Sequence, residues 1–158
     1  MSESLVDQIW EKIDLAAELY HRLILVVAPA GGGKTSALLD LHNRHGVPLF
    51  NVNLELSRKM LDLTERQRFL QLPRLVMDTV NEAKGDIVLL DNIELLFDVL
   101  LKQDPLRLLQ GISRNKTVVV SWNGLIDNNY LIYATPDHPE YKRYPVRDLL
   151  IATPKERK

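Results

Sequence analysis

Three consecutive glycines, followed by a lysine and two hydroxyl side chains, form the segment with the clearest chemical potential. It reads Ala28-Pro29-Ala30-Gly31-Gly32-Gly33-Lys34-Thr35-Ser36. The spacing follows the phosphate-loop (P-loop) pattern Gly-x-x-x-x-Gly-Lys-Ser/Thr, with alanine in place of the first glycine. Glycines allow a tight curl in which several backbone N–H groups face one phosphate group. The segment therefore predicts a binding site for a nucleoside triphosphate, ATP with Mg²⁺.

The polar side chains that end this segment have distinct expected roles. Lys34 is expected to reach the β- and γ-phosphates, Thr35 to place its hydroxyl on Mg²⁺, and Ser36 to contact the α-phosphate. The alternative is a glycine-rich turn with an exposed lysine. The setting favours the phosphate loop, because an apolar run at residues 23–27 predicts a buried strand before it and residues 35–43 read as a helix after it.

A magnesium ion bound with the nucleotide requires a further oxygen ligand. Asp91 ends the apolar run at residues 87–90 and is the best candidate, although a residue of this type also caps helices. Many P-loop ATPases have a glutamate directly after this aspartate, whereas this chain has Asn92 and then Glu94 two residues further on. Glu94 is the candidate catalytic base, with a solvent-facing position as the alternative.

Three further residues are candidates for contacts with the γ-phosphate. Ser121 and Asn123 follow the β-branched run at residues 117–120, where they can donate hydrogen bonds or simply supply turn polarity. Arg114 is the first choice for an arginine that stabilises the transferred charge, which in this class is often delivered by a neighbouring subunit. The other arginines considered for this role are Arg58, Arg107 and Arg143.

The elements that must position these residues alternate between helices and strands. Residues 1–22 predict a leading amphipathic helix with an apolar face formed by Leu5, Ile9, Ile13, Ala17 and Tyr20. Residues 49–53 predict a second strand. Thr64 and Gln67 form a capping box for a helix that Pro73 is expected to break, and Asp104 with Pro105 begins another helix ending at Gly111.

This order predicts an α/β three-layer fold of the P-loop NTPase type, in one domain spanning residues 1–158. The sheet is expected to be mostly parallel. Only residues 123–129 separate the last two predicted strands, 117–120 and 130–133, which is too few for a parallel crossover. The last strand is therefore expected to be antiparallel. Prolines concentrated after residue 135 predict an irregular carboxyl-terminal segment, residues 136–158.

Composition limits where the chain acts and what it contacts. It has 158 residues, 46% hydrophobic and 26% charged, with no cysteine and a net charge of −1. No apolar run is long enough to cross a membrane, and the acidic amino terminus does not resemble a secretory signal, so a cytoplasmic protein is expected. DNA contact through Arg114 and Lys116, or through the tail at residues 155–158, is possible but is not supported by the net charge.

Four segments outside the loop also resemble one family. They are residues 91–97 (DNIELLF), 104–115 (DPLRLLQGISRN), 122–124 (WNG) and 138–141 (HPEY). From about Leu23 to Tyr144 the chain resembles BrxF, the small P-loop proteins of type 3 bacteriophage-exclusion (BREX) systems. This resemblance implies a bacterial cytoplasmic protein that works with other defence proteins, including a methyltransferase and a larger ATPase, to mark host DNA and block phage.

Three functions remain open from the sequence. The first is an ATPase or ATP-dependent switch that changes its contacts to partner proteins, with a homo-oligomer as one form of assembly. The second is a scaffold that binds ATP without hydrolysing it, which is consistent with Asn92. The third is a small-molecule or nucleoside kinase. It ranks lowest because residues 124–129, between the last two predicted strands, contain no arginine for a mobile lid.

Overall fold

The central feature of the fold is a parallel sheet. The computed structural model describes residues 4–154 and places five strands in the order β2-β3-β4-β1-β8, with every pairing parallel. The strands are β1 (Leu23–Ala28), β2 (Leu49–Asn51), β3 (Ile87–Asp91), β4 (Thr117–Asn123) and β8 (Leu150–Ala152). Because they are parallel, their carboxyl ends lie along one edge of the sheet, where ligands bind in open α/β folds.

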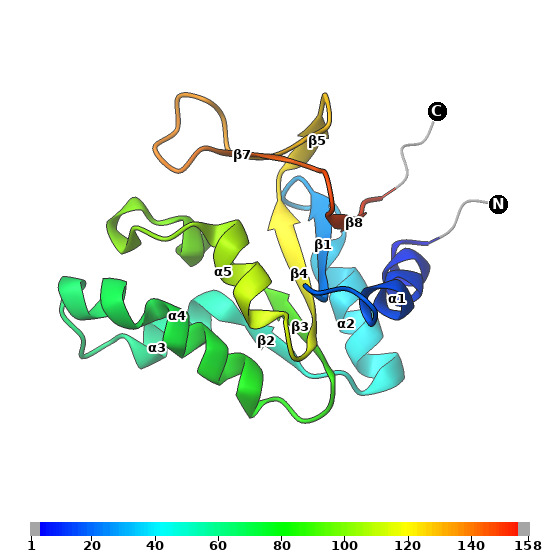
Figure 1. The fold of residues 1–158 in the computed structure, drawn as a ribbon, viewed down its shortest axis with the longest axis horizontal. Coiled ribbons are helices and arrows are strands. Elements are labelled where there is room, and N and C mark those ends of the chain that lie inside the picture. Colours follow the sequence, from blue (N-terminus) through cyan, green and yellow to red (C-terminus); the bar gives the residue numbers. More distant parts are fainter. Residues whose placement is uncertain (1–3, 155–158) are drawn as a thin grey trace.

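Helices cover both faces of this sheet (Figure 1). α1 (Leu5–Ala16) and α2 (Lys34–His45) pack on one face, and α3 (Val52–Lys59), α4 (Glu65–Glu82) and α5 (Pro105–Ile112) on the other. Side chains of β1 alternate between the two cores, so that Ile24 and Val26 face α1 and α2 while Leu25 and Val27 face the opposite layer. The predicted mixed α/β, three-layer architecture is confirmed at this level.

The leading helix is shorter than predicted. It begins after Ser4, whose side chain accepts a hydrogen bond from the Asp7 N–H, and it ends at Ala16. The apolar face runs through Ile9, Ile13 and Ala16, so the predicted contributions of Ala17 and Tyr20 are wrong. Tyr20 is 66% exposed, because the chain has already turned towards β1 at that position.

Pro73 does not break its helix, which corrects the prediction. α4 continues from Glu65 to Glu82 with Pro73 inside it. A proline lacks the N–H that would donate to the carbonyl four residues earlier, here that of Phe69. The side-chain amide of Gln103 donates to this Phe69 oxygen at 3.0 Å and replaces the missing bond. The predicted capping box is confirmed, since Thr64 and Gln67 bond each other's backbone N–H reciprocally.

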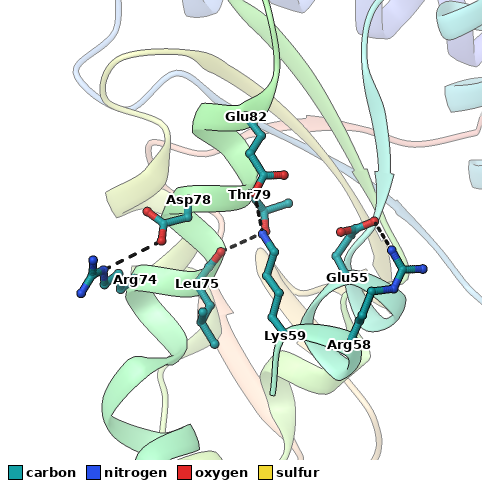
Figure 2. Close-up of polar contacts among 8 residues, drawn as sticks. All are labelled: Glu55, Arg58, Lys59, Arg74, Leu75, Asp78, Thr79 and Glu82. Carbon is teal, nitrogen blue, oxygen red and sulfur yellow. Dashed lines mark hydrogen bonds and ion pairs between the residues drawn. The ribbon is translucent and has the colours of Figure 1, made fainter. Parts of the chain in front are cut away.

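Helices α3 and α4 are joined by one central lysine (Figure 2). Lys59 donates to Thr79 Oγ1 at 2.7 Å and to Glu82 Oε1 at 2.9 Å. Thr79 in turn donates to the Leu75 carbonyl at 2.9 Å. The neighbouring ion pairs of Arg58 with Glu55 and of Arg74 with Asp78 are longer, each 3.9 Å, and involve exposed arginines. Pairs of that kind contribute little to stability.

A second, three-stranded sheet lies beyond the carboxyl ends of β1 and β4 (Figure 1). Its strands are β5 (Leu125–Asp127), β6 (Tyr130–Tyr133) and β7 (Lys142–Pro145), and both of its pairings are antiparallel. The antiparallel strand predicted at residues 130–133 therefore exists, but it is not part of the main sheet. Asn128 and Asn129, with φ of 48° and 67°, form the tight turn between β5 and β6.

Residues 136–154 are more ordered than predicted. They contain β7 and β8, and β8 forms the edge of the main sheet by pairing with β1. The prediction of an irregular segment is wrong here because three- and four-residue strands leave too short a pattern to recognise, and their partners are distant in the sequence. The tail at residues 155–158 lies outside the described residues. The predicted strand at residues 49–53 ends at Asn51, which caps α3.

Candidate functional site

Three glycines shape the loop between β1 and α2, each for its own reason. Gly31 and Gly33 have φ of 81° and 90°, in the left-handed region that side chains rarely adopt. Gly32 is required by lack of space, because a Cβ there would lie 2.7 Å from Ala28 Cβ and 2.9 Å from Pro29 O. Its N–H donates to Pro29 O at 3.0 Å. The loop is therefore tightly curled at the carboxyl end of β1, as predicted.

The amino terminus of α2 differs from those of the other α-helices in residues 4–154. Gly33 occupies its N-cap position and offers no side-chain acceptor. The other four α-helices are capped by side chains of Ser4, Asn51, Thr64 and Asp104. The first N–H groups of a helix have no partner within it, and the helix dipole adds partial positive charge there. An anion bound at this terminus would satisfy both requirements.

Lys34 is buried beside this terminus, with only 5% of the residue exposed. Its ammonium donates to the carbonyl oxygens of Ala28 at 2.9 Å and of Pro29 at 2.8 Å. Burial lowers the pKa of Lys34 because it disfavours the charged form, and the carboxylates of Asp91 and Glu94 partly oppose that effect. A buried cation whose side-chain hydrogen bonds go to neutral carbonyls gains strongly from a bound anion.

Asp91 connects three elements at the carboxyl edge of the sheet. It is 6% exposed and accepts hydrogen bonds from Thr35 Oγ1 at 2.8 Å and from Ser121 Oγ at 2.5 Å. The N–H of Asn92 donates to the same carboxylate at 3.0 Å. The structure thus brings together the two residues predicted to hold Mg²⁺, Thr35 and Asp91. A hydroxyl and a carboxylate oxygen are the hard ligands that this ion prefers, so the residues present fit a magnesium ion.

Glu94 is positioned by a residue that was not predicted from the sequence, Asn53. The Asn53 N–H donates to the Asn92 carbonyl at 2.9 Å, and its side-chain oxygen accepts from the Leu95 N–H at 2.8 Å. Asn92 itself has a φ of 54°, a conformation that asparagine tolerates better than most residues. These bonds hold Glu94, which is half-buried, at the start of a short 3₁₀ helix, η1 (Glu94–Phe97). Asn53 is 42 residues away from Leu95, so no local pattern could have identified it.

These groups surround one pocket of about 410 Å³. It is lined by Ala30, Gly31, Gly33, Lys34, Thr35, Ser36, Asp91, Asn92, Glu94, Ser121 and Asn123. The predicted residues Ala28, Pro29 and Gly32 lie on the outer side of the loop and line a different hollow. Asn92 is the one lining residue that was not predicted as part of the site. The sequence indicated Asn92 only as the residue that replaces the usual glutamate after the aspartate.

Arg114 is not in this pocket. It precedes β4, whereas the pocket lies where β4 ends, so the whole length of the strand separates them. Its guanidinium lies over the Tyr20 ring, 4.6 Å from the centroid. Arg143 lies over the Tyr130 ring in the second sheet, and Arg58 pairs with Glu55. Among the described residues, Lys34 is the only cation that lines the pocket.

An aromatic cluster packs the second sheet against η1 and β4. Tyr133 of β6 stacks on Phe97, with ring centroids 3.5 Å apart, and Trp122 of β4 packs edge-on against Phe97 at 5.1 Å. Burial raises the pKa of Tyr133 to about 12, with smaller contributions from Glu140 and Glu94. Gly124 is required beside this cluster, because a Cβ there would clash with the Ile132 carbonyl oxygen. Its N–H donates to Ala28 O at 3.1 Å and fixes the sheet to the loop.

No model of a known protein family matches this chain, and no curated protein sequence matches it either. The helices in residues 4–154 all fall short of the combination of length and apolar character that a membrane span requires. The chemistry of the pocket is therefore the main guide to function.

Proposed function

We propose that this chain binds Mg-ATP in the pocket formed by the glycine loop and acts as an ATPase or an ATP-dependent switch. The observation that carries the proposal is the convergence of Lys34, Thr35 and Asp91 beside the uncapped amino terminus of α2. Lone glycine turns are common, but a turn that adds a buried lysine and a hydroxyl–carboxylate pair at one sheet edge has the chemistry that a triphosphate requires. This supports a fold of the P-loop NTPase type.

Each group has a defined task in this proposal. The free N–H groups at the start of α2 and the Lys34 ammonium neutralise the β- and γ-phosphates. Thr35 and Asp91 would hold Mg²⁺, directly or through its water shell, and the ion would supply neutralisation of phosphate charge. Ser121 keeps the Asp91 carboxylate oriented through its 2.5 Å hydrogen bond. Ser36 and Asn123 line the same pocket and contact the α- and γ-phosphates.

Glu94 is the residue that we propose as the catalytic base. It is half-buried and lines the pocket together with Asp91, so it can accept a proton from a water molecule beside the γ-phosphate. Hydrolysis by the isolated chain should be slow, because no arginine of the described residues lines the pocket to stabilise the transferred charge. An arginine from a second copy or from a partner protein would supply this charge.

The binding proposal is tested by titration calorimetry with Mg-ATP. Lys34→Ala should weaken binding by about 100-fold or more, because the charged hydrogen bonds to phosphate are lost. Lys84→Ala removes the same charge from an exposed position outside the pocket and serves as the matched control. Equal affinity of the wild-type and Lys34→Ala proteins would show that the glycine loop does not bind ATP.

Single-turnover phosphate release distinguishes the ATPase from a non-hydrolysing scaffold. Asn92, in place of the usual glutamate, is the observation that keeps the scaffold as a second candidate. Glu94→Gln should reduce the rate by about 100-fold, within the range for loss of a general base. Glu18→Gln, at an exposed carboxylate in the turn after α1 that does not line the pocket, is the control. No release by the wild-type chain, alone or with partner proteins, would favour the scaffold.

The resemblance to BrxF supports a role in a BREX defence complex, and we propose that the output of the switch is a contact to other proteins of that system. The proposal predicts that a strain carrying Lys34→Ala in this protein loses phage restriction. Restriction at the wild-type level by that strain would refute it.

A further inference from the structure

We propose that the nucleobase of the bound nucleotide lies in an apolar hollow on the outer side of the glycine loop, with Gln8 contacting its polar edge. This inference rests on the proposed binding of ATP. The hollow has a volume of about 720 Å³ and is formed by α1, β5 and the residues that follow β8. Its lining includes Gln8, Pro29, Gly32, Leu125, Ile126 and Pro154.

The order of strands indicates the direction in which the nucleotide runs. Asp91 ends β3 and Ser121 lies near the end of β4, both on one side of β1, while β8 and α1 lie on its other side (Figure 1). Metal-bound phosphates must lie towards Asp91. The base is joined to the opposite end of the phosphate chain, so it extends across β1 towards β8 and α1. The apolar hollow lies at this place.

The loop itself links the two sites. Gly31 and Gly33 line the phosphate pocket, and Gly32 between them lines the apolar hollow. A second hollow of about 380 Å³ also borders the loop; it shares Ala30 and Asn123 with the phosphate pocket, shares Pro29, Gly124 and Leu125 with the apolar hollow, and contains Glu140. Of these two hollows, only the one beside Gly32 extends to α1 and to the residues after β8, on the side of β1 that faces away from Asp91.

The walls of this hollow suit a flat aromatic ring. Leu125 is 49% exposed and Ile126 is 40% exposed, although both lie in a concave part of the surface. Exposed apolar side chains that line a concavity, with a few polar groups, are typical of ligand sites. Pro29 and Pro154 add rigid apolar surfaces on either side. A bound base would bury the apolar area that the structure leaves open here.

Gln8 supplies a polar group at this apolar site. Its side-chain amide donates to the Thr153 carbonyl at 3.0 Å, and its oxygen accepts from the Thr153 N–H at 3.4 Å. A glutamine amide has two donors and an oxygen with two acceptor positions, so one of each remains for a ligand. Thr153 occupies the edge on which the amide N–H and oxygen lie side by side, so the free N–H and the free lone pair point to opposite flanks of the amide, and either can bond one polar atom of a base. The two bonds to Thr153 hold the amide in place before the ligand arrives.

The decisive experiment compares Mg-ATP with magnesium tripolyphosphate, which has the phosphates but no base. The double variant Leu125→Ser with Ile126→Ser should bind Mg-ATP about tenfold more weakly, because less apolar surface is buried, and should bind tripolyphosphate as the wild type does. Gln8→Ala should weaken only ATP binding, by about fivefold for one lost hydrogen bond. Leu15→Ser, at a side chain that is 61% exposed and outside the hollow, is the control and should change neither affinity.

The outcomes separate this inference from the proposed function. Equal affinity of the wild type for ATP and tripolyphosphate, or no effect of the substitutions on ATP binding, would overturn the base site and leave phosphate binding intact. Failure of the wild type to bind either ligand would overturn the proposed function and the base site together. Photolabelling with 8-azido-ATP tests the position directly. Label on residue 126 or on residues 153–154 supports the hollow, and label on residues 134–141 refutes it.

Discussion

The amino termini of α2 and α4 show two opposite uses of the same helical feature. At α4, Thr64 accepts from the Gln67 N–H at 3.2 Å, and the Gln67 side chain accepts from the Thr64 N–H at 2.9 Å. At α2, Gly33 leaves the first N–H groups without a side-chain cap. At the start of α4, side chains of this chain satisfy the backbone N–H groups, and this stabilises the fold. The start of α2 has no such partner, which is the condition for binding an anion from outside.

The comparison predicts that substitutions near α2 change ligand binding more than stability. Asp91→Ala gives the largest expected effect, with Mg-ATP affinity about 100-fold lower, because the ion loses its carboxylate. Binding measured in EDTA should change much less. Asp78→Ala, an exposed carboxylate on α4, is the control and should leave binding unchanged. An equal effect of Asp91→Ala with and without Mg²⁺ would remove Asp91 from the metal site.

Gly33→Ala tests the loop conformation itself. A side chain at φ of 90° costs about 1–2 kcal/mol, so urea unfolding should show a loss of stability of that size. Mg-ATP affinity should fall as well, because the strained loop no longer presents its N–H groups correctly. Gly111→Ala is the matched control. This glycine is inside α5 with nothing within 4 Å of an added Cβ, so alanine should stabilise the helix by up to about 1 kcal/mol.

Thr64→Ala should lower stability without changing ligand affinity. Loss of the cap at α4 should reduce the free energy of unfolding by about 1 kcal/mol, measured by urea denaturation. Mg-ATP affinity should remain at the wild-type value, since Thr64 does not line the pocket. A change in affinity comparable with that of Gly33→Ala would contradict the division of roles between the two helix termini.

The smallest expected effect is a decline of Mg-ATP affinity as the pH rises. Because burial lowers the pKa of Lys34, this group loses its proton at a lower pH than an exposed lysine does. Phosphate binds the protonated form, so Mg-ATP affinity should fall as the pH rises through the lowered pKa of Lys34. Calorimetry over alkaline pH should show this decline in the wild type. The weaker Mg-ATP binding that remains in Lys34→Ala should depend less on pH.

Much of the fold followed from local patterns. The strand before the glycine loop, the helix after it and the caps at Thr64 and Asp104 were all correctly predicted. Two of the errors involve distant partners. Pro73 remains inside α4, where Gln103 donates to the carbonyl that the proline leaves free, and β8 forms because β1 offers a paired edge. Neither partner is visible from the residues around Pro73 or β8.

The residues of the candidate site also fall into two groups, those predicted from local patterns and those placed by distant contacts. The sequence by itself determined the curl of the loop and its lysine and hydroxyl groups, because glycine conformation and helix capping depend on residues a few positions apart. Only the tertiary structure placed β4 between β1 and β3, which brings Ser121 onto Asp91 and leaves Arg114 at the far end of the strand. Strand order depends on packing both faces of the sheet against helices, and that is a property of the whole chain.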